Sequence, residues 1–264
     1  MMNPEQVEAA AVQLIADREA NRLMGHWPDT WRPANTDDAY AIQDGVHAKR
    51  ADAGQDLGGW KIGCTTPVMQ EMLGIASPCV GGVLAADIHP SPLTASFDQF
   101  TSPLAECEIA VRLGADVPAS GSGYDRDTVA PYVDTVMAAM EIAEDRYQDR
   151  SERTVAEFIA DDFFQKAVVL GAERTDWQRL DLAAMTGTTH VGGEFRGRGK
   201  GSDVMGHPFA ALAWLADHLA GRGKHLRKGD IVLTGSVVIA TPIGRGEETT
   251  CAIEGLGEAR LLLT

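Results

Sequence analysis

The stretch Ala105-Glu-Cys-Glu-Ile-Ala-Val-Arg-Leu113 decides the fold. Apolar side chains occupy every second position from Ala105 to Leu113, and Glu106 and Glu108 fall between them. A period of two residues predicts a β-strand, because successive side chains of a strand point to opposite faces. The chain therefore contains a long strand with two carboxylates on the same face.

The rest of the chain divides around residue 57. From Gly58 onward, short apolar runs separated by Gly and Pro predict a β-rich body. In this body we also predict strands at 167–170 and 231–234 and hairpins at 186–196 and 250–263. Before residue 58 the pattern is helical, with helix starts at Asn3-Pro4 and Thr36. We expect an α+β fold, with a helical region 1–57 packed on a catalytic body 58–264 as one integrated unit.

Three more helices are predicted within the body. Asp127 is placed to cap a helix that carries Val129, Val133, Val136, Met137 and Met140. Residues 155–164 form a second helix, and the third starts at His207-Pro208, where His207 caps it, and ends near Gly221. The Gly-rich run 197–202 fits neither the Walker (P-loop) pattern nor the dinucleotide-binding fingerprint. We interpret it as a solvated hairpin loop.

Composition excludes several classes of protein. The chain of 264 residues is 44% hydrophobic and 23% charged, which is typical of a globular protein. Its net charge of −15 disfavours nucleic acid and anionic membranes as partners. Four cysteines without a Cys-x-x-Cys pair disfavour a zinc ribbon, a redox pair or a disulfide scaffold. With no signal peptide and no membrane-length apolar run in the sequence, we expect a cytoplasmic protein.

Three carboxylates are candidate metal ligands. Glu106 and Glu108, two residues apart on a strand, lie roughly 6.5 Å apart on one face and repel each other unless water or a cation intervenes. Glu141 lies in an otherwise apolar run, where a lone carboxylate is costly to bury. Oxygen ligands without Cys or His favour Mg²⁺ or Mn²⁺. The alternative is that the two strand glutamates form the polar face of a half-buried strand.

Lys61 is a candidate catalytic residue in Gly58-Gly-Trp-Lys-Ile-Gly63. Between an aromatic and an aliphatic residue, its amine can act as a partly desolvated acid, base or electrophile. The alternative is a surface lysine whose aliphatic stem covers apolar neighbours.

Five motifs in order resemble one known family. They are Gly59-Trp-Lys-Ile-Gly-Cys-Thr65, Pro103-Leu-Ala-Glu-Cys-Glu-Ile109, Met140-Glu-Ile-Ala-Glu-Asp-Arg146, Gly206-His-Pro208 and Gly229-Asp-Ile-Val-Leu-Thr-Gly-Ser236. Together they resemble the 2-keto-4-pentenoate hydratase / 4-oxalocrotonate decarboxylase family of the fumarylacetoacetate hydrolase superfamily. The resemblance implies a mixed β-roll, Mg²⁺ or Mn²⁺, a homo-oligomer and a small 2-oxo or 2-hydroxydienoic acid as substrate. It also implies that Glu106, Glu108 and Glu141 hold the metal and that Lys61 is the active-site lysine.

The chain departs from that family at three places. Cys79 stands where relatives carry an acid/base Asp, so the resemblance gives the catalytic position to a thiol. The Asp-Asn of relatives, followed by small residues, is here Asp161-Asp162 followed by two phenylalanines. Ser236 is retained, but Val238 follows where relatives often supply a hydroxyl to the substrate. These positions imply substrate contacts at Asp162, Ser236 and Val238.

The function expected from the resemblance is that of a hydro-lyase. It would add water to a 2-hydroxy-2,4-dienoate or 2-oxo-alkenoate and give a 4-hydroxy-2-oxo acid in the catabolism of ring compounds. The departures leave three alternatives open: decarboxylation of a 2-oxo diacid, carbon–carbon hydrolysis of an acylpyruvate, and non-catalytic binding of a 2-oxo acid. The substrate tail, the number of subunits and the preferred metal do not follow from the sequence.

Overall fold

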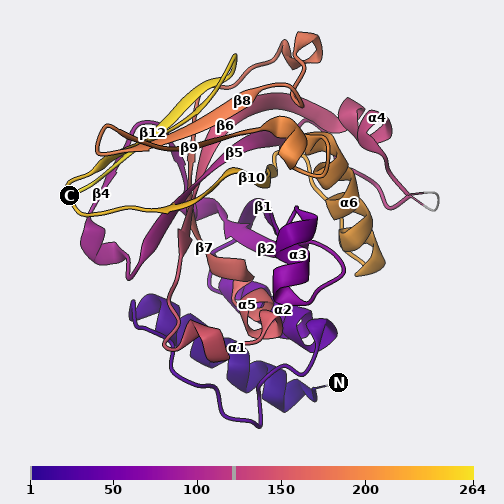
Figure 1. Ribbon diagram of the computed structural model, residues 1–264. Coiled ribbons are helices and arrows are strands. Elements are labelled where there is room, and N and C mark those ends of the chain that lie inside the picture. Colours follow the sequence, from indigo (N-terminus) through magenta and orange to yellow (C-terminus); the bar gives the residue numbers. More distant parts are fainter. Residues whose placement is uncertain (1, 121–122) are drawn as a thin grey trace.

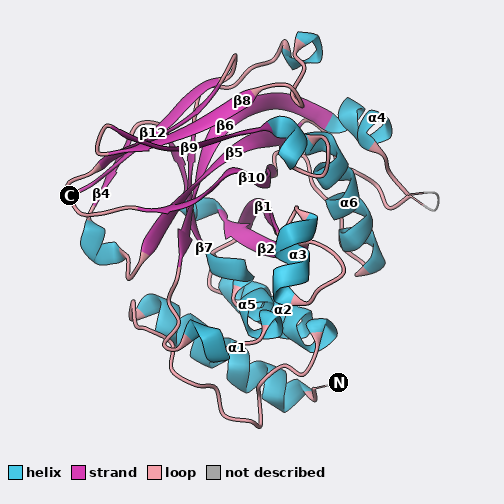
Figure 2. Cartoon of the chain, viewed as in Figure 1, coloured by secondary structure: helices cyan, strands magenta, loops and turns pink. Residues whose placement is uncertain are grey.

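Two curled β-sheets form the body of the protein. The computed structural model describes residues 2–120 and 123–264. The smaller sheet lies over one face of the larger sheet, and the N-terminal helices pack at the opposite end of the molecule (Figures 1 and 2). The larger sheet contains β1 (Leu57–Gly63), β2 (Cys79–Leu84), β3 (Ile88–Pro90), β5 (Pro103–Leu113), β6 (Val133–Glu144), β7 (Gln165–Leu170) and β10 (Ile231–Pro242). The smaller sheet contains β4 (Leu93–Ala95), β8 (Thr186–Val191), β9 (Glu194–Lys200), β11 (Glu248–Ile253) and β12 (Gly257–Leu263).

The strand order brings distant parts of the chain together. The seven-stranded sheet has the order β2-β1-β10-β5-β6-β7-β3, and the five-stranded sheet has the order β4-β12-β11-β8-β9. Most neighbours are antiparallel, whereas the pairs β1–β10, β3–β7 and β4–β12 are parallel. Such mixed sheets around α-helices confirm the expected α+β fold with a mixed β-roll.

The helices of the described residues are α1 (Pro4–Glu19), α2 (Thr36–Asp52), α3 (Pro67–Leu73), α4 (Arg126–Val129), α5 (Val155–Ala160) and α6 (Pro208–Gly221). Helices α1, α2 and α6 begin where the sequence predicts, whereas α3 was not predicted. The Asn3 side chain accepts a hydrogen bond from the Gln6 amide at the start of α1. His207 Nδ1 accepts one from the Phe209 amide, 3.0 Å away, at the start of α6. Both side chains satisfy backbone donors that a helix leaves unpaired in its first turn.

The predicted helix after Asp127 is wrong. Asp125, not Asp127, caps α4, which ends at Val129, and the chain then continues as strand β6 from Val133. Pro131 interrupts the helical pattern in a short 3-10 turn. β6 is buried between β5 and β7, so both of its faces are apolar and its residues show no period of two. A fully apolar run of this kind fits helical and strand spacing equally well.

Two shorter predictions also need correction. The helix expected over 155–164 ends at Ala160, and residues 162–164 adopt positive φ angles in a tight turn. The run 197–202 is not a hairpin loop, because β9 continues to Lys200 and the hairpin turns at Gly192-Gly193. Residues 194–200 form an exposed edge strand, whose polar side chains resemble those of a loop.

The hydrophobic core runs through both predicted regions. One cluster of buried side chains contains Leu14 and Ile42 from the helices and Ile109 and Leu261 from the sheets. The boundary between regions 1–57 and 58–264 remains a prediction, and the core is continuous across it. Among the described residues, no helix combines the length and the apolar character that crossing a membrane requires.

Candidate active site

Glu106, Glu108 and Glu141 converge on one point of the larger sheet. Glu106 and Glu108 lie on β5, and Glu141 lies on β6 directly opposite Glu106 in the antiparallel register. One carboxylate oxygen from each residue lies within 4.8 Å of the others. Glu108 and Glu141 are 1% and 0% exposed, which excludes the alternative of a solvated polar strand face.

The fold holds these carboxylates where they repel one another. The Gly235 amide donates a hydrogen bond of 2.8 Å to Glu108 Oε2 at an irregular point in the pairing of β10 with β5. Burial, reinforced by the neighbouring carboxylates, raises the pKa of Glu108 well above its ordinary value. Burial also raises the pKa of Glu141, to about 7, although Lys61 opposes the change. Full ionisation of the three carboxylates is therefore unfavourable here unless a further positive charge joins the cluster.

Lys61 is the cation of this cluster. It lies on β1, is 3% exposed, and its Nζ is 3.0 Å from Glu141 Oε1. Burial alone would lower the pKa of Lys61, but the nearby carboxylates outweigh burial and raise it. The structure thus excludes the alternative of a surface lysine and gives a buried ammonium group against the carboxylates.

The donor set fits a divalent cation. Glu141 Oε2 is buried and has no hydrogen-bond partner among the described residues. A buried carboxylate oxygen in that state is costly unless a cation or a bound ligand contacts it. Three carboxylates against one ammonium also leave a net charge that Mg²⁺ or Mn²⁺, both oxygen-preferring ions, would offset.

A cavity of about 380 Å³ opens beside the carboxylates. Its lining includes Lys61 and Glu106, together with Ser236 and Val238 from β10. The hydroxyl of Ser236 donates a hydrogen bond to the backbone carbonyl of Val238. The structure therefore brings Glu106, the lysine and two of the predicted substrate contacts to the lining of one cavity, and Glu108 and Glu141 lie buried beside Glu106.

Cys79 lies outside the lining of this cavity. It begins β2 opposite Gly63 of β1 and is 1% exposed. The neighbouring Cys64 thiol, together with burial, raises the pKa of Cys79. Cys64, which follows β1, lines the carboxylate cavity instead. A neutral thiol in this position cannot act as a general base at neutral pH.

Asp162 also faces away from the carboxylates. Its Oδ1 accepts hydrogen bonds from the Gly82 amide (2.7 Å) and pairs with His47 Nε2 (2.8 Å). The residue lines a separate cavity of about 220 Å³, bounded by α1 and α2. Its substrate contact remains a prediction from the resemblance, and its observed role is to anchor the turn that follows.

Sequence reasoning missed several residues that line the carboxylate cavity. Cys64, Arg150, Phe163 and Phe164 all contribute to its wall. Cys64 belongs to the motif at 59–65 that also contains Lys61, so its place in that motif could have identified it as a residue of the site. Arg150 follows β6 by several residues in an irregular segment, and no local pattern indicates that it returns to the sheet.

Comparison with known proteins places the chain in a family. Residues 88–262 match the family described as fumarylacetoacetate (FAA) hydrolase, C-terminal. A 2-keto-4-pentenoate hydratase of Paraburkholderia phymatum is 32% identical over 98% of both chains. A 2-hydroxyhexa-2,4-dienoate hydratase of Comamonas testosteroni is 29% identical over the full length of both.

A solved structure has the same fold over its whole length. The 4-oxalocrotonate decarboxylase of Pseudomonas putida G7, complexed with magnesium and adipate, has a TM-score of 0.93 to this chain. The match covers 100% of this chain and 99% of the other, at 24% sequence identity. With hydro-lyases among its relatives, the chain is an enzyme of the lyase class. It belongs to the fumarylacetoacetate hydrolase superfamily, in the family that contains the 2-keto-4-pentenoate hydratases and 4-oxalocrotonate decarboxylases.

Proposed function

We propose that the protein is a divalent-metal-dependent hydratase of a 2-hydroxy-2,4-dienoate or 2-oxo-alkenoate, active in the catabolism of ring compounds. The product is a 4-hydroxy-2-oxo acid. The 2-hydroxydienoate first tautomerises to a 2-oxo-3-alkenoate, as the 2-hydroxyl loses its proton and C5 gains one. The hydroxyl of water then joins C4 and a proton joins C3. The hydratases among its relatives support the reaction, and magnesium in the related decarboxylase structure supports a metal.

The observation that carries the proposal is the buried cluster of three carboxylates with one ammonium. Glu106, Glu108 and Glu141 would hold Mg²⁺ or Mn²⁺. When bound, such an ion supplies Lewis-acid polarisation of the oxygens of a 2-oxo acid. Glu141 Oε2 has no hydrogen-bond partner within the described part of the chain, so it is available as a ligand for a cation.

Lys61 supplies the proton chemistry. Its ammonium group lies in the cavity wall and remains charged, because carboxylates surround it. A fixed positive charge beside the 2-oxygen stabilises the negative charge that develops when the substrate tautomerises. Its Nζ also carries a proton that can pass to a substrate carbon and return.

Decarboxylation of a 2-oxo diacid is the second candidate. The solved structure with a TM-score of 0.93 is a decarboxylase, and Cys79 replaces the acid/base carboxylate expected in a hydratase. Loss of CO₂ requires stabilised charge on the 2-oxygen but no base to activate water. The same cluster therefore supports both reactions, and the product distinguishes them.

The test is a panel of substrates with the purified protein and Mg²⁺. We expect a monocarboxylic 2-hydroxydienoate to gain 18 mass units in one product. Loss of CO₂ from a 2-oxo diacid would support the second candidate instead, and two products from an acylpyruvate would indicate carbon–carbon hydrolysis. No reaction with any of the three classes would contradict both candidates.

The homo-oligomer and the cytoplasmic location remain predictions from the sequence. The acidic net charge continues to disfavour nucleic acid as a partner.

A further inference from the structure

We propose that the turn Asp162–Phe164 makes the cavity select a substrate with an uncharged, apolar tail and reject one with a second carboxylate. This inference rests on the proposed function, because it concerns the part of a 2-oxo acid that extends away from Lys61 and the carboxylates. It assigns the choice of tail to Phe163 and Phe164, two residues outside the metal cluster.

The turn has an unusual backbone that its neighbours maintain. Asp162, Phe163 and Phe164 have φ angles of 52°, 49° and 70°, in the left-handed region that bulky residues rarely adopt. The carboxylate of Asp162 fixes the turn to β2 through the Gly82 amide and to α2 through His47. Such a conformation persists only where surrounding contacts determine it, so the two rings have fixed positions.

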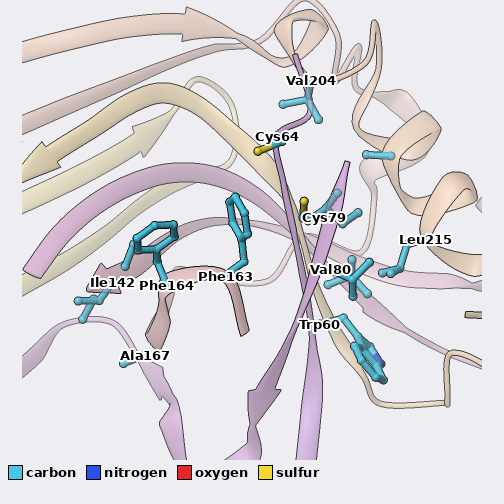
Figure 3. Close-up of a cluster of buried hydrophobic side chains, with 14 of the residues drawn as sticks. Trp60, Cys64, Cys79, Val80, Ile142, Phe163, Phe164, Ala167, Val204 and Leu215 are labelled. Atoms are coloured by element: carbon cyan, nitrogen blue, oxygen red, sulfur yellow. The ribbon is translucent and has the colours of Figure 1, made fainter. Parts of the chain in front are cut away.

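Phe163 closes the cavity beside Lys61. The Lys61 Nζ lies 5.2 Å from the centroid of the Phe163 ring. A Cβ atom at Gly63 would lie only 2.6 Å from Phe163 Cδ1, so the ring packs directly against β1. Figure 3 shows both phenylalanine rings projecting from the same turn. Their centroids lie 5.3 Å apart with perpendicular planes.

Phe164 adds a second aromatic ring to the lining of the cavity. Its ring lies 4.8 Å from that of Phe158, and both rings line the cavity. The other apolar side chains of the lining are Ile62, Met69, Leu73, Leu104, Ala143, Val237, Val238, Ile239 and Ala240. A substrate tail that extends away from Lys61 therefore meets a lining in which apolar side chains outnumber polar ones. Each methylene buried there contributes about fourfold to affinity.

The charged lining residues offer no site for a second carboxylate. Apart from Lys61, Arg150 is the cation among the described residues of the lining. Its guanidinium lies over the Phe164 ring at 4.9 Å, its Nη1 is 3.2 Å from Asp145 Oδ2, and its side chain is 51% exposed. Asp203 adds a negative charge to the same lining. A tail carboxylate would thus lose water without gaining a buried, unpaired cation.

The experiment compares 2-hydroxydienoates that differ only in the tail. We expect kcat/KM with Mg²⁺ to rise from hydrogen to methyl to propyl, by up to about fourfold for each methylene. A carboxylate-ended tail of the same length as propyl should be at least about tenfold poorer. Phe164→Ala should remove most of the preference for propyl. Phe164→Leu, which keeps an apolar side chain if the alanine variant does not fold, should reduce it less.

A matched control removes an aromatic ring elsewhere. Phe195→Ala, on the exposed edge strand β9, takes away a ring that is 57% exposed and should keep the wild-type order of tails. The proposal is overturned if the carboxylate-ended substrate is preferred and Arg150→Gln lowers the rate of that substrate alone. Equal rates for all tails overturn it as well.

Binding separates this inference from the proposed function. Calorimetry with Mg²⁺ and the saturated acids 2-oxohexanoate and 2-oxoadipate measures tail preference without turnover. Tighter binding of 2-oxohexanoate by at least about tenfold supports the inference even if no dienoate is hydrated. Equal or weaker binding of 2-oxohexanoate overturns the inference even if hydration is observed, and so does the failure of both acids to bind.

Discussion

Two buried groups of charges in this protein differ in their balance. At Asp161, one carboxylate meets the guanidinium groups of Arg18 and Arg146, and the Tyr147 hydroxyl donates to its Oδ2 over 2.8 Å. At the candidate active site, three carboxylates share one ammonium, and Glu141 Oε2 has no hydrogen-bond partner in residues 2–120 and 123–264. In both groups most side chains are almost completely buried, whereas Arg18 in the first group and Glu106 in the second are partly buried.

The difference separates a structural site from a functional one. The fold supplies every partner that Asp161 needs, so its arginines lower the pKa of Asp161 even though burial opposes them. At the active site, burial and mutual repulsion raise the pKa of Glu108 and Glu141. A protein keeps such an unbalanced cluster only where a ligand completes it, which is the reason that we assign the metal there.

Removing the ammonium group of Lys61 from the active-site cluster should give the largest effect. We expect Lys61→Met to lower kcat at saturating Mg²⁺ by about 10²–10⁴-fold, the range for loss of a positioned acid/base. Mg²⁺ should bind the variant at least as tightly, because a repelling positive charge has been removed. Steady-state kinetics and calorimetry measure the two effects. Capture of a covalent Lys61–substrate adduct by borohydride would contradict this role and indicate a Schiff base.

Removing the carboxylate of Asp161 from its balanced cluster with Arg18 and Arg146 should lower the stability of the fold instead. Asp161→Asn leaves two buried arginines without their carboxylate and should lower the free energy of unfolding by about 3–5 kcal/mol. In the metal-free protein, Glu108→Gln relieves repulsion and should not lower this free energy. Urea unfolding compares the two variants. A larger loss of stability in Glu108→Gln than in Asp161→Asn would reverse our distinction between the sites.

The sequence indicates the unbalanced cluster far better than the balanced one. Glu106 and Glu108 share a recognisable strand. Glu141 follows a segment that the sequence pattern predicts as a helix, so only the family resemblance placed it with the other two. Arg18, by contrast, reaches Asp161 from a helix 143 residues earlier, so no local pattern could reveal that contact. The same limit applies to β6, because a strand buried on both faces shows no alternation of polar and apolar residues. It also applies to the positive φ angles of Phe163 and Phe164, because the contacts of Asp162 with Gly82 and His47 maintain that turn.

Cys79 should give a smaller effect than either cluster. Because its thiol is buried, has a raised pKa and lies outside the cavity lining, Cys79→Ala should lower kcat by less than tenfold, or about 1.4 kcal/mol. Cys79→Asp should raise any weak hydratase activity if the aspartate carboxylate reaches the cavity. A thousandfold loss in Cys79→Ala, with folding and Mg²⁺ binding intact, would show that the thiol takes part in the reaction.

The smallest expected effect is a difference in pH dependence. The pKa of Asp161 is lowered in the folded state, so the unfolded chain takes up a proton first as the pH falls. Its contribution to stability is complete above the unfolded pKa, about 4, and is lost as the pH falls through the folded value. Asp161→Asn should flatten the unfolding curve below pH 4 by at most about 1.4 kcal/mol per pH unit. An unchanged slope in the variant would show that the arginines do not hold this carboxylate ionised.

Calorimetric titration with Mg²⁺ tests the central claim most directly. The unbalanced cluster predicts one site per chain in the wild-type protein and no measurable binding in Glu108→Gln, whose circular dichroism should match the wild type. Asp161→Asn, where it is folded, should bind Mg²⁺ as the wild type does, because its carboxylate belongs to the balanced cluster. Unchanged Mg²⁺ affinity in Glu108→Gln would contradict the assignment of the metal to Glu106, Glu108 and Glu141.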